Sequence, residues 1–168
     1  MDIRASKRFT VIVFTLTIAV IAFAFIHSSM PAEASKEESE GVLDFLVNFL
    51  KGIGISAELT DHIVRKAAHF AEYTAMGILF TSCAYCFDRK KPYRYTPQIM
   101  LAGLSTAVID ETIQLNVEGR AGMITDVLLD FSGIVTGFAA ALAFYIIYYK
   151  INRENKRGFY EQGNCKGK

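Results

Sequence analysis

Four apolar blocks, each close to the length of a membrane-spanning helix, constrain this chain more than any other feature. They cover residues 9–26, 67–87, 97–113 and 131–149 of the 168-residue sequence. A helix needs roughly 20 predominantly apolar residues to cross a bilayer. The sequence therefore predicts an all-α integral membrane bundle of four transmembrane helices.

Lys and Arg are distributed unevenly among the segments that flank these blocks. Residues 1–8, 88–96 and 150–168 hold 13 of the 18 basic residues. In a four-span bundle these three segments lie on the same side of the membrane. Because cytoplasmic flanks of membrane helices carry the excess of Lys and Arg, both termini are predicted to be cytoplasmic.

The blocks and charges divide the chain into three regions. Residues 1–60 are predicted to contain a membrane anchor, an acidic extracytoplasmic loop and an amphipathic helix. Residues 61–150 would form a three-helix membrane domain, and residues 151–168 a basic cytoplasmic tail that is disordered at its end. The amphipathic stretch "GVLDFLVNFLKGIGI" is too short to span, so it would lie in the outer interface, pack over the bundle or cover a site.

The first block has a second interpretation as a signal peptide. Ala32, Glu33 and Ala34 form a small-x-small pattern at which cleavage would follow Ala34. The apolar core of this block is longer than the usual 7 to 15 residues of a signal peptide. A retained helix is therefore favoured.

Ionisable residues occur inside the predicted spans and gather near one level. At about 1.5 Å of rise per residue, His69, Glu72, Asp110 and Glu111 lie roughly 21 to 28 Å above the cytoplasmic ends of their helices. Asp130 lies about 30 Å from the cytoplasmic end of the last helix, at its outer rim. The sequence thus predicts a polar layer close to the outer surface of the membrane.

Helical spacing places these residues on shared faces. Two groups each occupy one face: His69, Glu72 and Tyr73 in the second block, and Asp110 and Glu111 with Gln114 in the third. Asp126, Asp130 and Gly133 share a stripe of the last helix. A charged group near the bilayer centre costs roughly 2.5 to 3.5 kcal/mol. We therefore expect the three helices to face one another and form a polar cup that opens to the outside.

Structural roles are alternatives for single members of this group. His69 could be a hydrogen-bonded helix-interface residue, and Glu72 could form an ion pair with Arg65 or Lys66. Asp126 could cap a helix, where a carboxylate complements the helix dipole. The sequence leaves these alternatives open.

Glycines mark a turn and a helix contact. Arg120 lies between Gly119 and Gly122, where it could be a solvated turn residue or bind a phosphate or carboxylate together with exposed backbone N–H groups. Gly133 and Gly137 form a G-x-x-x-G pattern, which is typical of close helix packing in membranes.

Three motifs resemble the VanZ-like family of small bacterial membrane proteins. They are "RKAAHFAEY" from Arg65, "DETIQLNVEGRAG" from Asp110 and "DVLLDFSGIVTG" from Asp126, within a resemblance that covers roughly residues 61–149. The family is named for an accessory protein of glycopeptide-resistance clusters that is associated with teicoplanin resistance. The resemblance implies a multi-pass protein of the bacterial cytoplasmic membrane that influences glycopeptide susceptibility.

The family's polar pattern falls on residues already singled out by their depth and spacing. It matches His69, Tyr73, Asp110, Glu111, Gln114, Gly119, Arg120, Asp126 and Gly133. Glu118 stands where many members have Pro, and Asp130 stands where Asn is common. The predicted binding site consists of His69, Glu72, Tyr73, Asp110, Glu111, Gln114, Gly119, Arg120, Asp126 and Asp130.

Two functions fit these residues. In the first, the cup binds an envelope component, such as a cell-wall precursor, or teicoplanin itself. In the second, the protein is a membrane-embedded enzyme acting on a lipid-linked substrate, with His69, Glu72, Asp110 and Glu111 as acid/base groups or as ligands for Mg²⁺ or Mn²⁺. The sequence contains no two-His motif, so no metal site is predicted, and it specifies no cofactor.

Two further classes are disfavoured. A transporter would carry its charges near the bilayer midplane, whereas here they gather toward one end. Nucleic-acid binding has no support beyond the basic tail, which membrane topology already explains. The predicted partners are therefore the lipid bilayer and an envelope ligand.

Overall fold

The computed structural model describes residues 5–34, 41 and 60–165, with side chains given as far as residue 152. Its helices are α1 (Lys7–Ser28), α3 (Asp61–Phe87), α4 (Thr96–Gln114) and α5 (Ile124–Cys165), and a short 3₁₀ helix, η1 (Pro92–Tyr95), precedes α4. No strand occurs in the described ranges, so the all-α prediction is confirmed for them. The predicted amphipathic helix lies outside the described residues apart from Gly41, and so does the part of the acidic loop that follows Ala34.

Local sequence signals explain where the helices begin. Thr60 is the N-cap of α3, and its hydroxyl accepts a hydrogen bond from the Ile63 backbone N–H at 3.4 Å. Ser6 caps α1 in the same way through Phe9. A proline stands in the first turn of α4, where its missing N–H leaves no intrahelical bond unmade. The four helices therefore begin within a few residues of the predicted blocks, except that α3 and α5 start one to two turns earlier.

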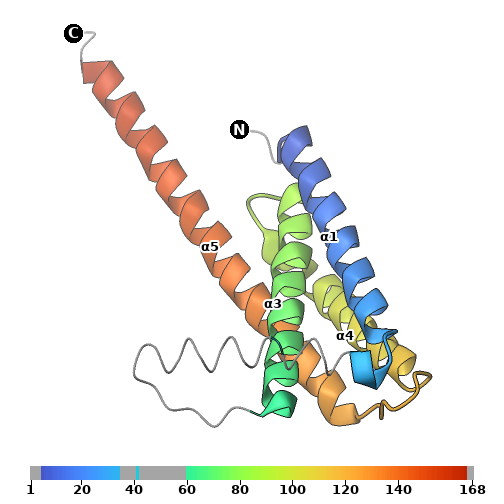
Figure 1. The fold of residues 1–168 in the computed structure, drawn as a ribbon. Coiled ribbons are helices and arrows are strands. Elements are labelled where there is room, and N and C mark those ends of the chain that lie inside the picture. The colour runs from blue at the N-terminus through green and yellow to red at the C-terminus, as the bar shows by residue number, and fades with distance from the viewer. Residues whose placement is uncertain (1–4, 35–40, 42–59, 166–168) are drawn as a thin grey trace.

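The helices pack as neighbours around one small core. Figure 1 shows α1, α3 and α4 side by side, while α5 crosses α3 and then continues away from the other helices. Buried residues from all four helices meet in the core, namely Ala24, Tyr73, Met76, Ala107 and Ile134. This arrangement places α3 at the centre of the bundle.

Small residues allow α3 and α5 to approach closely. A Cβ atom built on Gly133 would lie 2.7 Å from the carbonyl oxygen of Phe70, and one on Gly137 would overlap the carbonyl oxygen of Thr74. Gly77 faces the Ile134 backbone from the other side of the same contact. The prediction that the G-x-x-x-G pattern serves close helix packing is confirmed.

The exterior of the bundle is apolar and part of the interior is polar. Leu16, Leu101 and Phe144 are among the exposed large side chains, whereas Thr81 and Asp110 are buried. In soluble proteins large apolar side chains are mostly buried and charged side chains mostly exposed, so this bundle reverses the usual pattern. It is the arrangement expected when the solvent around the helices is lipid.

Two of the described helices are long and apolar enough to cross a membrane. They are α1 and the 124–152 part of α5, and only 17% and 28% of their most apolar windows are buried. A soluble core helix would be mostly buried, so their exposure favours contact with lipid. α3 and α4 are less apolar, and the count of four membrane spans stays a prediction.

The last helix extends beyond the predicted end of the last span. α5 continues without a break past Lys150 to Cys165. Residues 151–165 of the predicted tail are therefore helical, and the last three residues of the tail lie outside the described part of the chain. The segment lacks proline and contains several good helix formers, so a helix that is already nucleated can continue through it.

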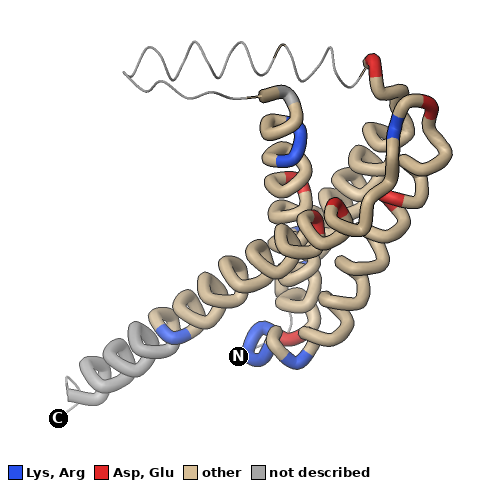
Figure 2. The backbone as a smooth tube through the Cα atoms, turned by 90° about the horizontal axis from the view of Figure 1, so that it is seen from below, with Lys and Arg blue, Asp and Glu red and all other residues tan. Residues whose placement is uncertain are grey.

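The two ends of the bundle differ in charge. The basic end is formed by the start of α1, the end of α3 and the start of α4, and the acidic end by the end of α1, the start of α3, the end of α4 and the start of α5. Figure 2 shows Lys and Arg clustered at the basic end, near the N-terminus, and most acidic residues toward the other end. The predicted separation of charge along the helices is thus present in the fold.

Candidate functional site

A polar cavity of about 240 Å³ opens at the acidic end. Its walls come from the first turns of α3, the end of α4, the loop that follows α4, and the first turns of α5. The lining residues are His62, Arg65, Lys66, His69, Glu111, Gln114, Gly119, Arg120, Ala121, Met123, Asp126, Leu129 and Asp130.

Most of the predicted binding residues line this cavity. They are His69, Glu111, Gln114, Gly119, Arg120, Asp126 and Asp130. Glu72, Tyr73 and Asp110 do not line it. Asp110 is nevertheless adjacent, because its carboxylate lies beside two residues that do, as described next.

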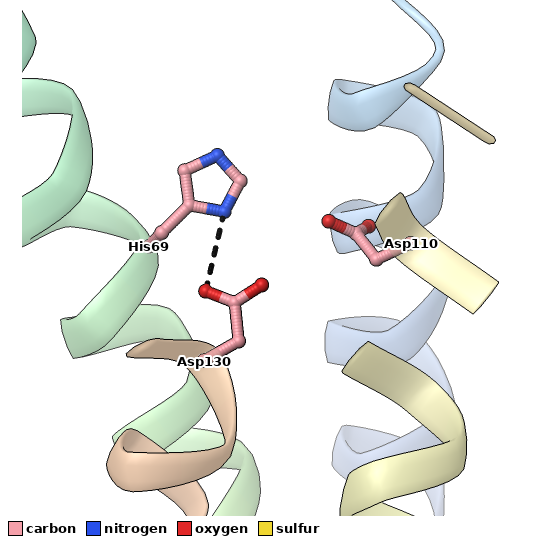
Figure 3. A group of neighbouring side chains, drawn as sticks. All are labelled: His69, Asp110 and Asp130. Atoms are coloured by element: carbon pink, nitrogen blue, oxygen red, sulfur yellow. Dashed lines mark ion pairs between the residues drawn. The ribbon is translucent and has the colours of Figure 1, made fainter. Parts of the chain in front are cut away.

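One histidine and two carboxylates from three helices meet beside the cavity. Figure 3 shows His69 of α3, Asp110 of α4 and Asp130 of α5 directed toward one another. One ligand atom from each lies within 4.8 Å of the others. The Nδ1 atom of His69 is 3.7 Å from Oδ1 of Asp130, which is an ion-pair distance and too long for a hydrogen bond. We call these three residues the carboxylate–histidine group.

Several buried oxygens around this group lack a hydrogen-bond donor among the described residues. They are Oε1 of Glu72, the Tyr73 hydroxyl, Oδ1 of Asp110, Oε2 of Glu111 and both Oδ atoms of Asp130. Buried polar atoms in folded proteins nearly always have a partner, which can be ordered water or an ion. Their concentration in one place therefore marks a binding site better than any single member does.

Glu111 has a structural partner in addition to its place in the cavity. Its Oε1 atom accepts a hydrogen bond from the Met123 backbone N–H at 2.5 Å, immediately before the first residue of α5. Asp110 instead has its Oδ2 atom hydrogen-bonded to Gln114 Nε2 at 3.1 Å. The two adjacent acids thus have different partners, and Glu111 fixes the start of α5.

An ion pair joins α3 and α5 at the cavity wall. Lys66 Nζ lies 2.8 Å from Oδ1 of Asp126, and the two side chains are 33% and 30% exposed. The alternative that Lys66 pairs with Glu72 is wrong, because the carboxylate on α5 takes this cation. The structural interpretation of Asp126 gains support, since the pair ties the first turn of α5 to α3.

Arg120 lies in the loop between α4 and α5. Gly119 before it has φ of 77°, a left-handed conformation that favours glycine. One guanidinium nitrogen of Arg120 donates to the backbone carbonyl of His27 at 3.4 Å. Partial burial, followed by the nearby Arg65, lowers the pKa of Arg120. Its cation is therefore imperfectly compensated and suited to an incoming anion.

The end of α1 completes the acidic end, which sequence reasoning missed. Gln114 Nε2 lies 3.4 Å from the hydroxyl of buried Ser28, and the rings of His27 and His69 are 6.3 Å apart. The first helix is therefore part of the packed bundle, and its retention in the membrane stays a prediction. The polar "HSS" at the end of the first apolar block is the sequence signal that could have indicated a role for this helix end at the site.

Three residues of α3 that were not predicted as binding residues also line the cavity. They are His62, Arg65 and Lys66, and they share the cavity wall with His69. The other three of these four are spaced at three, four and seven residues from His62, which is the spacing of one helix face. This stripe was readable from the sequence.

The fold and the site together define a class: a helical membrane protein with a charged cavity at one end of the bundle. Comparison with known families gives the particular assignment. The VanZ/LLP1 family model matches residues 13–148, and the chain belongs to this family. The match begins inside α1, so it extends the resemblance toward the N-terminus. Neither the curated proteins nor the solved structures include a significant match to the chain.

Proposed function

We propose that the cavity binds the polar headgroup of a cell-envelope component, and that this binding contributes to teicoplanin resistance. The observation that carries the proposal is a cavity lined by charged side chains at one end of a bundle whose exterior is apolar. A headgroup at the membrane surface could enter such a cavity while its lipid part stays in the bilayer.

The lining residues indicate the chemistry of the ligand. Arg65 and Arg120 offer guanidinium donors, which suit a phosphate or carboxylate. Asp130 and Glu111 also line the cavity and offer acceptors for hydroxyl or ammonium groups. A headgroup that carries both an anion and hydroxyl groups, as lipid-linked cell-wall precursors do, matches this division.

Cavity size favours a headgroup over a whole antibiotic molecule. Pockets for drug-sized ligands span roughly 300 to 1,000 Å³. This cavity, at about 240 Å³, falls below that range. The link to teicoplanin would then be indirect. A lipid-anchored antibiotic must act at the same interface, where the protein would compete for the precursor or shield it.

Growth in rising teicoplanin concentrations tests the proposal. A sensitive Gram-positive host would carry empty vector, the parent protein, Arg120→Gln or Arg94→Gln at matched membrane levels. Arg94 is an exposed arginine in η1 at the basic end, so it controls for loss of one positive charge. We expect the parent and Arg94→Gln to protect and Arg120→Gln to lose protection.

Direct binding separates the ligand from the phenotype. Purified full-length protein in lipid nanodiscs would be titrated with a lipid-linked cell-wall precursor and, separately, with teicoplanin. Saturable binding of the precursor that Arg120→Gln weakens would support the proposal. Protection that is equal in parent and Arg120→Gln, with no saturable precursor binding, would refute it.

An enzymatic function is the second candidate, favoured by the carboxylate–histidine group. His69 and Asp130 line the cavity, so they could transfer a proton to a bound substrate. The two cysteines with described side chains, Cys83 and Cys86, lie near the basic end and cannot reach it. Release of phosphate or headgroup from a lipid-linked substrate, lost in Asp130→Asn, would establish this function.

A further inference from the structure

The two aspartates of the carboxylate–histidine group are almost completely buried. Asp110 is 0% exposed and Asp130 is 1% exposed. Only one of their four carboxylate oxygens, Oδ2 of Asp110, accepts a hydrogen bond from a described residue. The other three are therefore available to a ligand.

Negative charge exceeds positive charge around the group. The acidic end holds the carboxylates of Glu72, Asp110, Glu111, Asp126 and Asp130, against the cations of Arg65, Lys66 and Arg120. Lys66 forms an ion pair with Asp126, and Arg120 donates a hydrogen bond to the His27 carbonyl. No Lys or Arg among the described side chains lies within salt-bridge distance of Asp110 or Asp130. Two buried carboxylates then meet beside the His69 imidazole without a lysine or arginine partner, which is costly in a low-dielectric interior.

From these observations we propose that His69, Asp110 and Asp130 bind a divalent transition-metal ion such as Zn²⁺ or Mn²⁺. Two charges of the ion would offset the two aspartates, and the imidazole would supply a neutral nitrogen ligand. The inference is independent of the headgroup proposed above, because the ion requires only these three side chains.

Distances between the donor atoms are compatible with a shared ion. Metal–nitrogen and metal–oxygen bonds of about 2.0 to 2.2 Å place two ligands of one ion roughly 3 to 4 Å apart. Nδ1 of His69 and Oδ1 of Asp130 are 3.7 Å apart, and the widest separation in the group is within 4.8 Å.

The donor set selects among metals. Imidazole suits Zn²⁺ and other transition metals, whereas Mg²⁺ and Ca²⁺ prefer oxygen ligands alone. Three protein ligands with a further position left open is the arrangement of reactive zinc sites. Because His69 and Asp130 line the cavity, the open position would face it and accept water or an oxygen of a ligand.

Protons or waters are the alternative partners of the two aspartates, so the experiment must detect the ion itself. Full-length protein in nanodiscs would be stripped with a chelator and titrated with Zn²⁺ alone, followed by metal analysis after desalting. The variants are Asp130→Asn and His69→Gln. The matched control is Asp126→Asn, an acid one turn away on the same helix that pairs with Lys66.

We expect one ion per chain in the parent and in Asp126→Asn. Asp130→Asn and His69→Gln should each bind at least about 10-fold more weakly, since even outer partners of metal ligands cost 10 to 100-fold in affinity. An absence of stoichiometric binding in the parent would overturn the proposal. Equal binding by all forms would also overturn it, and so would an equal loss of binding in Asp126→Asn. In either case the binding would not depend on the three assigned side chains in particular.

A second measurement needs no variant and therefore does not depend on whether a variant folds. Mn²⁺ bound to the parent would be examined by pulsed electron paramagnetic resonance for coupling to an imidazole nitrogen. Coupling supports the assigned ligands, and bound Mn²⁺ without nitrogen coupling refutes them. Failure of metal binding would leave precursor binding and teicoplanin protection to be judged by their own assays.

Discussion

The basic and acidic ends of this bundle both bury polar side chains, yet the acidic end leaves several of their oxygens without a hydrogen-bond partner. At the basic end, the Tyr145 hydroxyl donates to Ser82 Oγ at 2.8 Å, and Ser82 Oγ donates to the Ile78 carbonyl at 2.7 Å. The Tyr145 ring also stacks on Tyr85 with centroids 4.0 Å apart. At the acidic end, both carboxylate oxygens of Asp130 lack a hydrogen-bond donor.

We interpret this difference as one between polar groups that stabilise the fold and polar groups that are available to a ligand. A paired buried group contributes modestly to stability, whereas an unpaired one costs the free energy of its desolvation. A protein tolerates such a cost where function requires it. The following predictions, from the largest expected effect to the smallest, test whether the two ends differ in this way.

Gly137→Val should have the largest effect, because it disrupts the α3–α5 contact on which both ends depend. The new side chain would overlap the Thr74 carbonyl oxygen, and the helices would have to separate. We expect a loss of about 3 kcal/mol in the free energy of unfolding, measured by circular dichroism in detergent micelles. Ala139→Val, on the exposed face of α5, is the control and should change stability little.

Asp130→Asn should stabilise the metal-free protein while it removes the proposed function. The substitution replaces a buried carboxyl group beside Asp110 with an uncharged amide, whose N–H groups suit the unpaired oxygens there. We expect a gain of about 1 to 3 kcal/mol in the free energy of unfolding at neutral pH without metal. A clear loss of stability would mean that Asp130 is a structural residue and that the contrast between the ends is false.

Tyr145→Phe tests the basic end, where removal of a polar group should lower the free energy of unfolding instead of raising it. The substitution removes the hydroxyl that donates to Ser82 but keeps the stacked ring. We expect a loss of about 1 kcal/mol in the free energy of unfolding, with teicoplanin protection and metal binding unchanged. If protection fell at unchanged protein level, the basic end would also belong to the functional site.

The Lys66–Asp126 pair should give the smallest effect. Both side chains are about one-third exposed, so solvent screens their attraction. A double-mutant cycle with Lys66→Gln and Asp126→Asn should give a coupling of about 0.5 kcal/mol. A coupling several times larger would show that this pair is a principal tie between α3 and α5.

Helix positions and several local features were predictable because they depend on short-range pattern. The apolar blocks located four helices, and the Gly133–Gly137 pattern indicated a close helix contact. Much of the site was also predictable, since a polar residue inside an apolar helix stands out in the sequence. His69, Asp110 and Asp130 were singled out on that ground alone.

The choice of partners among these residues was not predictable. Lys66 could have paired with Glu72 on its own helix but pairs with Asp126 on α5. The adjacent Asp110 and Glu111 are equally polar in sequence, yet one joins the carboxylate–histidine group and the other binds the start of α5. Such choices depend on the rotation of each helix about its axis and on the crossing of α3 with α5, which periodicity does not define.

The sequence by itself therefore determined that this chain is an all-helical member of its family with ionisable residues near one end of its helices. Hydropathy and residue spacing encode those properties along a single helix. Only the tertiary structure decided that the end of α1 closes the site and that one histidine and two aspartates from three helices meet there. These are contacts between segments 20 or more residues apart in the sequence, and they exist only once the close approach of α3 and α5 has fixed the packing.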